Sequence, residues 1–171
     1  ISRREEKLIG VYLFAISKWE KEFYSGILRW KHGGTEPLIV KRNSLEVTAE
    51  HLLECAGGPY RLFRVDGEHS LEVALHELRL ANAVMAEGGV IMVDDYFDPK
   101  FPGVSEAVNP FFLLYRNEVR VEPFLITGNK LFLATKEYEN LYREAIDATI
   151  DKNLEEVWDA ELFGPKETTI L

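Results

Sequence analysis

Four side chains that could bind a cation or move a proton follow two short apolar runs of this sequence. Asp66 and His69 belong to the segment DGEH after the run YRLFRV, and Asp94 and Asp95 follow the run VIMV. Carboxylate oxygens are the ligands that Mg²⁺ prefers, and imidazole titrates near neutral pH. If the fold brings these side chains together, Asp66, Asp94 and Asp95 could bind Mg²⁺, with His69 beside the ion. The alternative is that Asp and Gly only end two strands here.

The surrounding elements predict that these residues do meet. Tyr60–Val65 and Val90–Val93 are predicted strands, and Ser70 is placed to cap a helix between them that Gly88 and Gly89 are expected to end. Two strands joined by a helix of this length form a parallel βαβ unit. Neighbouring strands lie about 4.8 Å apart. Ligands of open α/β sheets bind beyond the carboxyl ends of such strands, so both acidic segments would face one crevice.

The run VDGEHSLEVALHELRLANAVMAEGGVIMVDDYFDPKFPGVSEAV resembles class I S-adenosylmethionine-dependent methyltransferases. It is most similar to small-molecule O-methyltransferases in which strand 4 ends in DGxHS and strand 5 in DDY followed by PGV. The likeness extends from about Pro37 to Leu133 and includes NSLEVT and GNKLFL. It implies a Rossmann-like α/β three-layer sandwich whose mostly parallel sheet ends in an antiparallel hairpin. It also implies S-adenosylmethionine as the methyl donor and a small-molecule acceptor.

The resemblance also assigns roles to residues. Asp66, Asp94 and Asp95 match metal ligands, here for Mg²⁺, and His69 is the candidate base for an acceptor hydroxyl. The candidates for contacting the methyl donor are Asn43, Ser44 and Asp66. In the family an acidic residue stands where this chain has Asn43. Asn offers one acceptor and two donors, and the alternative is a plain Asx turn.

The N-terminal side departs from the family pattern. The sequence contains no Gly-x-Gly, whereas the donor site of such folds depends on a glycine-rich turn after the first strand. The residues before Val11 are too few for a strand, that turn and a crossover helix. We therefore expect a domain truncated at its N-terminal side, without the first strand and the glycine loop.

The first 32 residues allow two predictions. They form one long helix, or Val11–Ile16 is a strand followed by a helix over Lys18–Lys31, and the apolar run VYLFAI favours the strand. In the family the missing strand lies beside the equivalent of Tyr60–Val65, whose open edge would promote aggregation. We therefore expect Val11–Ile16 to pair with Tyr60–Val65, or two chains to form a homodimer through residues before Gly33.

The rest of the chain predicts a regular alternation of elements. One more helical turn is expected after Asp151. The other predicted elements are a strand over Pro37–Arg42, a helix from Thr48 to Cys55, a helix over Ser105–Leu114, a hairpin of strands Glu118–Ile126 and Lys130–Thr135, and a helix over Glu137–Ile150.

Composition limits the class of protein. The 171 residues predict a single domain over positions 1–171, and the net charge of -9 argues against a non-specific nucleic-acid binder. No segment is long and apolar enough to predict a membrane span. The single cysteine, Cys55, fits a reducing compartment, so a cytoplasmic location is expected.

The sequence is compatible with two functions. The first is metal-assisted O-methylation of a small molecule that uses S-adenosylmethionine. The second is a non-catalytic methyltransferase-like remnant that serves as a binding or assembly module, which the absent glycine loop favours. A nicotinamide dehydrogenase would need the same glycine loop.

Overall fold

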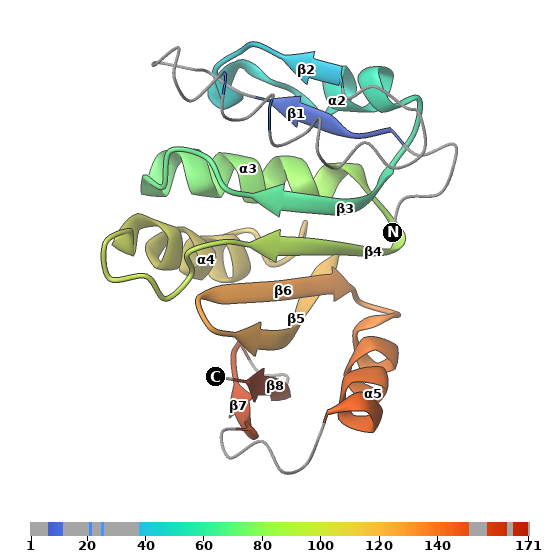
Figure 1. Cartoon of the computed structure of the whole chain (residues 1–171), viewed down its shortest axis with the longest axis vertical. Helices are drawn as coiled ribbons and strands as arrows, with labels where there is room; N and C mark the ends of the chain where they lie inside the picture. The colour runs from blue at the N-terminus through green and yellow to red at the C-terminus, as the bar shows by residue number, and fades with distance from the viewer. Residues whose placement is uncertain are drawn as a thin grey trace. The chain divides into compact units, whose positions relative to one another are not determined.

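The computed structural model describes residues 7–11, 21, 25, 38–150, 157–163 and 166–170. The chain forms two compact units, residues 1–58 and residues 59–171, and both are drawn in Figure 1. Among the described residues, no helix is long and apolar enough to cross a membrane.

The first unit contains two parallel strands and a helix. Strands β1 (Ile9–Val11) and β2 (Leu38–Val40) pair in parallel, and a 3₁₀ turn, η1 (Ser44–Glu46), leads to helix α2 (Ala49–Ala56). The hydroxyl of Thr48 accepts a hydrogen bond from the backbone N–H of His51, and Gly57 ends the helix. The helix predicted from Thr48 to Cys55 is therefore confirmed.

The N-terminal predictions fall mostly outside the described residues. Of the expected strand Val11–Ile16, only Val11 is described, as the last residue of β1. Lys21 and Ser25 have helical backbone geometry, but Ile9–Val11 is a strand, so the alternative of one long helix over the first 32 residues is wrong. Pairing of Val11–Ile16 with Tyr60–Val65 stays a prediction.

The second unit is built on a six-stranded sheet in the order β3-β4-β6-β5-β8-β7. Strands β3 and β4 are parallel neighbours, and β6 runs antiparallel to both β4 and β5. This confirms the βαβ unit and the hairpin that follows it. The elements are β3 (Tyr60–Val65), α3 (Leu71–Val84), β4 (Met85–Val93), α4 (Pro102–Leu114), β5 (Val121–Thr127), β6 (Lys130–Thr135), α5 (Glu139–Thr149), β7 (Val157–Glu161) and β8 (Lys166–Ile170).

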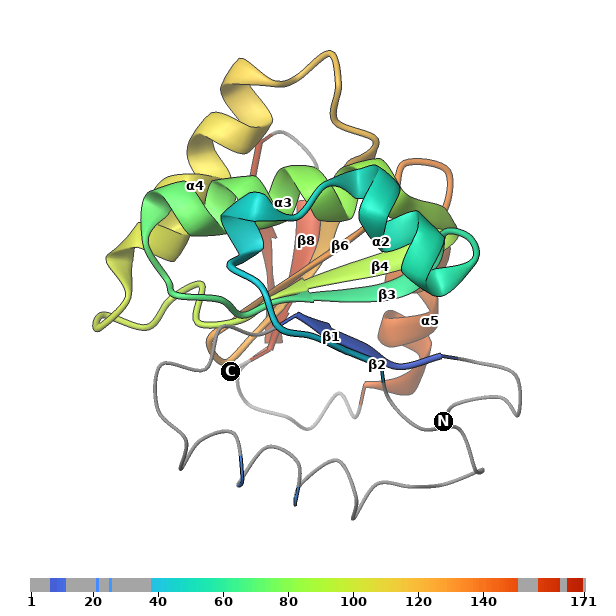
Figure 2. The same cartoon turned by 90° about the horizontal axis from the view of Figure 1, so that it is seen from above.

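The core of this unit lies between the sheet and two helices. Helices α3 and α4 cover one face of the sheet, and α5 lies on the other (Figure 2). Residues that alternate along the strands point into the core, as the two-residue period of a strand requires. On the strands, the fully buried residues include Ile91, Val93, Leu131 and Leu133, and on the helices they include Leu78 of α3 and Phe111 of α4.

The glycine pair does not end the helix, so that prediction is wrong. Helix α3 ends at Val84, and Gly88 and Gly89 lie inside β4. There the register shifts, since Tyr60 pairs with Met85 but Leu62 pairs with Val90. A Cβ on Gly89 would lie 3.0 Å from the carbonyl oxygen of Tyr60. The glycines therefore allow an irregularity in the sheet where two backbones come close.

The helical turn predicted after Asp151 lies outside the described residues. From Val157 on, β7 and β8 pair antiparallel, and β8 extends the sheet in parallel with β5, an extension that the sequence analysis did not predict. The segment KETTI of β8 carries three β-branched residues, which favour a strand once a sheet edge is within reach.

Candidate functional site

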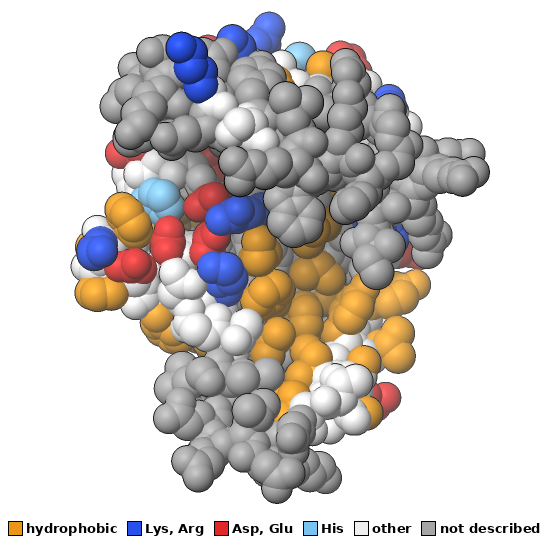
Figure 3. All heavy atoms as spheres, viewed as in Figure 1, with side chains coloured by type: hydrophobic (Ala, Val, Ile, Leu, Met, Phe, Trp, Pro, Cys, Tyr) orange, Lys and Arg blue, Asp and Glu red, His pale blue; other side chains and the backbone are white. Residues whose placement is uncertain are grey.

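Three of the predicted side chains converge where β3 and β4 end. One ligand atom from each of Asp66, His69 and Asp95 lies within 4.8 Å of the other two. The Nε2 atom of His69 is 3.1 Å from Oδ2 of Asp95 and 3.5 Å from Oδ1 of Asp66. Figure 3 shows acidic and basic side chains gathered around a histidine at this edge. The parallel pairing of the two strands therefore brings the two acidic segments together, as expected.

The backbone at this cluster has an uncommon conformation. His69 has φ 66° and Asp95 has φ 55°, so both lie in the left-handed region that residues other than glycine rarely adopt. Such conformations persist only where the surrounding structure enforces them, and they concentrate at functional sites. The surrounding structure therefore keeps two of the three clustered residues in the left-handed conformation.

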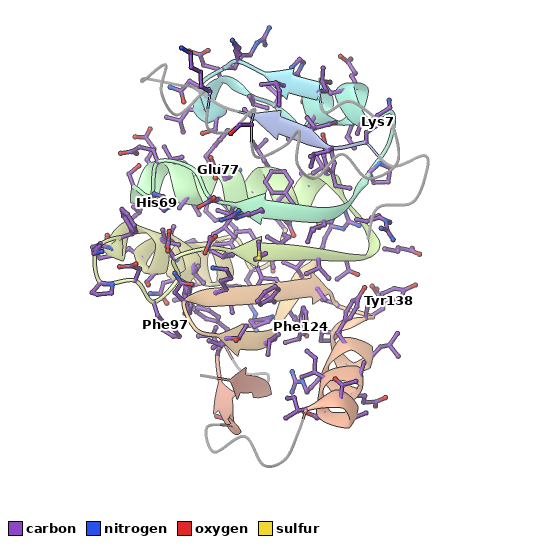
Figure 4. All side chains as sticks on the ribbon, viewed as in Figure 1. Lys7, His69, Glu77, Phe97, Phe124 and Tyr138 are labelled. Atoms are coloured by element: carbon purple, nitrogen blue, oxygen red, sulfur yellow. The ribbon has the colours of Figure 1, made fainter. Side chains whose placement is uncertain are left out.

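The loop after β4 and the start of α4 support His69 from two sides. The ring of Phe101 stacks on the imidazole, with centroids 4.2 Å apart. A Cβ on Gly103 would lie 2.6 Å from the carbonyl oxygen of His69, so only glycine allows α4 to start this close. Figure 4 shows His69 at this end of the sheet.

Asp94 lies beside the cluster but has different partners. Its side chain is only 5% exposed, and it pairs with Lys130 through Oδ1 and with Arg64 through Oδ2. Burial raises the pKa of Asp94, but the hydrogen bonds from Lys130 and Arg64 outweigh burial and hold that pKa below its ordinary value. Asp94 is therefore a buried, paired carboxylate, and its expected role as a metal ligand stays a prediction.

Asp66 is more accessible than Asp94. Its side chain is 35% exposed, and its Oδ2 lies 2.9 Å from Nη2 of Arg64. Burial raises the pKa of Asp66, Arg64 opposes this, and the negative charge of Asp94 adds to the rise. The Oδ1 atom of Asp66 faces His69.

The site also contains three residues that were not predicted from the sequence: Arg64, Asn129 and Lys130. The amide of Asn129 donates a 2.6 Å hydrogen bond to Oδ1 of Asp95, and Lys130 contacts both Asp94 and Asn129. Asn129 and Lys130 belong to the segment GNKLFL that carries the family resemblance. That segment was the signal that could have pointed to them.

The residues expected to contact the methyl donor are distributed over both units. In the first, Asn43 Oδ1 accepts a hydrogen bond from the backbone N–H of Leu45, which makes it the cap of η1. The Asx turn, which the sequence analysis gave as the alternative for Asn43, is therefore present. Ser44 is the first residue of η1. Donor contacts by Asn43, Ser44 and Asp66 remain predictions.

A methyltransferase domain family model matches residues 3–96, more than half of the chain. The chain belongs to this methyltransferase family. The match covers the predicted strand ends at Asp66, Asp94 and Asp95, so the resemblance noted in the sequence is confirmed.

A solved structure supports the fold of this methyltransferase domain. The chain is similar to the apo structure of a TDP-rhamnose 3′-O-methyltransferase, an enzyme in calicheamicin biosynthesis, with a TM-score of 0.55 and 16% identity. The similarity covers 75% of this chain but only 57% of the other. No curated protein matches the sequence.

Proposed function

We propose that this domain transfers a methyl group from S-adenosylmethionine to a hydroxyl group of a small molecule. The observation that carries the proposal is the convergence of Asp66, His69 and Asp95 at the ends of two parallel strands in a methyltransferase-family domain. In open α/β sheets, this is the edge where ligands bind.

The three side chains fit a divalent cation. The Nε2 atom of His69 is buried and has no hydrogen-bond partner among the described residues, although two carboxylate oxygens lie close to it. A cation between these atoms would satisfy all three. Two carboxylates and one imidazole suit Mn²⁺ as well as Mg²⁺, since imidazole is a ligand of transition metals.

When bound, such a cation lowers the pKa of a coordinated acceptor hydroxyl. Asp66 and Asp95 would hold it through the oxygen atoms that face His69, and the buried Nε2 atom of His69 would be the third ligand. The sequence-based hypothesis instead makes His69 the base that takes the hydroxyl proton. His69→Ala distinguishes the two roles. If His69 is a cation ligand, this variant loses both Mn²⁺ binding and turnover. If His69 is the base, the variant keeps Mn²⁺ binding and loses turnover.

For the methyl donor, we infer that Asn43 and Ser44 contact the adenine. The amide NH₂ group of Asn43 can donate a hydrogen bond to a ring nitrogen, while its oxygen caps η1. Asn43→Ala should then weaken donor binding. Calorimetry with S-adenosylmethionine and S-adenosylhomocysteine, with and without Mn²⁺ or Mg²⁺, tests the donor site directly.

A second candidate function is a non-catalytic binding or assembly module. It is favoured by the absence of any Gly-x-Gly in the sequence. Micromolar binding of the donor would argue against the module, and no binding at millimolar donor would support it. If the donor binds, TDP-rhamnose is the first acceptor to test, with S-adenosylhomocysteine formation as the readout.

The homodimer through residues before Gly33 also stays a proposal. Light scattering on the purified chain, compared with a variant that carries charged residues in the VYLFAI run, tests it. A parent that runs as a monomer at all concentrations would contradict it.

A further inference from the structure

Hydrogen bonds from this chain occupy every acceptor position of the Asp94 carboxylate. Lys130 Nζ and the backbone N–H of Asp95 donate to Oδ1, at 2.5 and 3.0 Å. Both Nε and Nη2 of Arg64 donate to Oδ2. A carboxylate offers about four acceptor positions. All of them are therefore taken by donors of this chain, and a cation could bind Asp94 only by displacing Lys130 or Arg64.

Asp66 and Asp95 differ from Asp94 in this respect. Each has one oxygen fixed by a donor of the chain, Arg64 for Asp66 and Asn129 for Asp95. The other oxygen of each carboxylate faces His69. Two carboxylates are thus oriented with one oxygen apiece toward the same point.

The two donors that fix these oxygens are joined through Asp94. Arg64 contacts Asp94 and Asp66 with the same Nη2 atom. Lys130 contacts Asp94 and also donates to Asn129 Oδ1 at 3.0 Å, and Asn129 holds Asp95. The buried carboxylate of Asp94, directly after β4, therefore connects a side chain of β3 and a side chain of β6.

We propose that Asp94 is a positioning residue that orients Asp66 and Asp95 through Arg64, Lys130 and Asn129, and is not a cation ligand. The inference rests on the proposed cation site and removes Asp94 from the ligands that the sequence predicts. Replacing a residue that holds a metal ligand in position without touching the metal typically weakens metal binding by about 10- to 100-fold. A buried carboxylate that accepts hydrogen bonds from two cations also stabilises the protein without metal, because hydrogen bonds to charged groups are stronger than those to a neutral amide.

The test compares Asp94→Asn with Asp95→Asn by thermal unfolding without metal and by calorimetric titration with Mn²⁺. Asp94→Asn should lower the melting temperature of the metal-free protein by about 5–10 °C and weaken Mn²⁺ binding about tenfold without abolishing it. Asp95→Asn should keep the metal-free melting temperature within about 2 °C and lose Mn²⁺ binding. Complete loss of Mn²⁺ binding in Asp94→Asn, or an unchanged melting temperature of its metal-free form, would overturn the proposal.

Two further results separate this inference from the proposed function. If the parent binds no Mn²⁺, the cation site fails, and the metal-free melting temperatures alone decide whether Asp94 is the connecting residue. If Asp94→Asn does not fold, Lys130→Met and Lys130→Arg replace it. Lys130→Met should lower the metal-free melting temperature and Lys130→Arg should restore it. A Lys130→Met protein as stable as the parent would overturn the proposal.

Discussion

The imidazole of His69 stacks on the ring of Phe101, with centroids 4.2 Å apart and planes inclined by 21°. His69 follows β3, whereas Phe101 belongs to the loop that follows β4. The contact therefore links the two loops that form the candidate site, and it holds a residue whose backbone is in the left-handed region.

Replacing Phe101 with Leu should loosen His69. Aromatic pairs contribute about 0.5–1.5 kcal/mol beyond area burial, so Phe101→Leu should cost about 1 kcal/mol of unfolding free energy and weaken Mn²⁺ binding several-fold. Phe97→Leu is the matched control, because Phe97 lies in the same loop and is 56% exposed. Equal effects of the two variants on Mn²⁺ binding would contradict a specific role for the stacking.

Gly103→Ala sets two effects of opposite sign against each other. Inside a helix, Ala is more favourable than Gly by about 1 kcal/mol. The new Cβ would lie 2.6 Å from the His69 carbonyl oxygen and 2.8 Å from the Leu71 nitrogen, and both are backbone atoms that cannot move easily. We expect the contact to dominate and the variant to lose about 1–3 kcal/mol in denaturant unfolding. A variant more stable than the parent would show that α4 shifts without strain.

Asn82 joins α3 to the chain before β5. Its amide donates to the carbonyl oxygen of Glu118 at 3.0 Å, and its oxygen accepts from the N–H of Arg120 at 2.8 Å. Asn82→Ala leaves both backbone groups without this partner, so about 1–3 kcal/mol of stability should be lost. The control is Asn109→Ala, since Asn109 is exposed and makes one 3.5 Å hydrogen bond. Similar urea midpoints for the two variants would refute the prediction.

Glu122 should make stability depend on pH. Burial raises its pKa, the charge of Glu139 adds to the rise, and Lys136 and Arg143 oppose it. Because the folded pKa lies above the unfolded value, ionised Glu122 opposes folding, and its effect is absent below the ordinary pKa of 4.5. Glu122→Gln should therefore be more stable than the parent at pH 7 and equally stable at about pH 4.

Urea unfolding of the parent and Glu122→Gln at both pH values measures this difference. Glu106→Gln, at an exposed position of α4, serves as the control for the loss of one negative charge. A stability gain in Glu122→Gln that is the same at both pH values would mean that ionisation is not its cause.

The sequence by itself determined the parts of the fold that depend on local signals. Tyr60–Val65 is a strand at the predicted bounds, Ser70 caps α3, and the DGEH and DD segments follow two parallel neighbours. These results follow from apolar periodicity, a helix-capping side chain and the length of the connection between strands. Each of these signals can be read from one continuous segment of the sequence.

The tertiary structure decided which side chains meet at the strand ends. Asp94 pairs with Arg64, 30 positions before it, and with Lys130, 36 positions after it. Those contacts depend on the register of β4 against β3 and β6. The same holds for Gly88, whose N–H and carbonyl oxygen bond to Thr135 and Tyr142, so that a pair of glycines lies in a strand and does not end a helix. Nothing in the residues next to Asp94 or Gly88 distinguishes these outcomes, because the partners come from strands and a helix that only folding brings close.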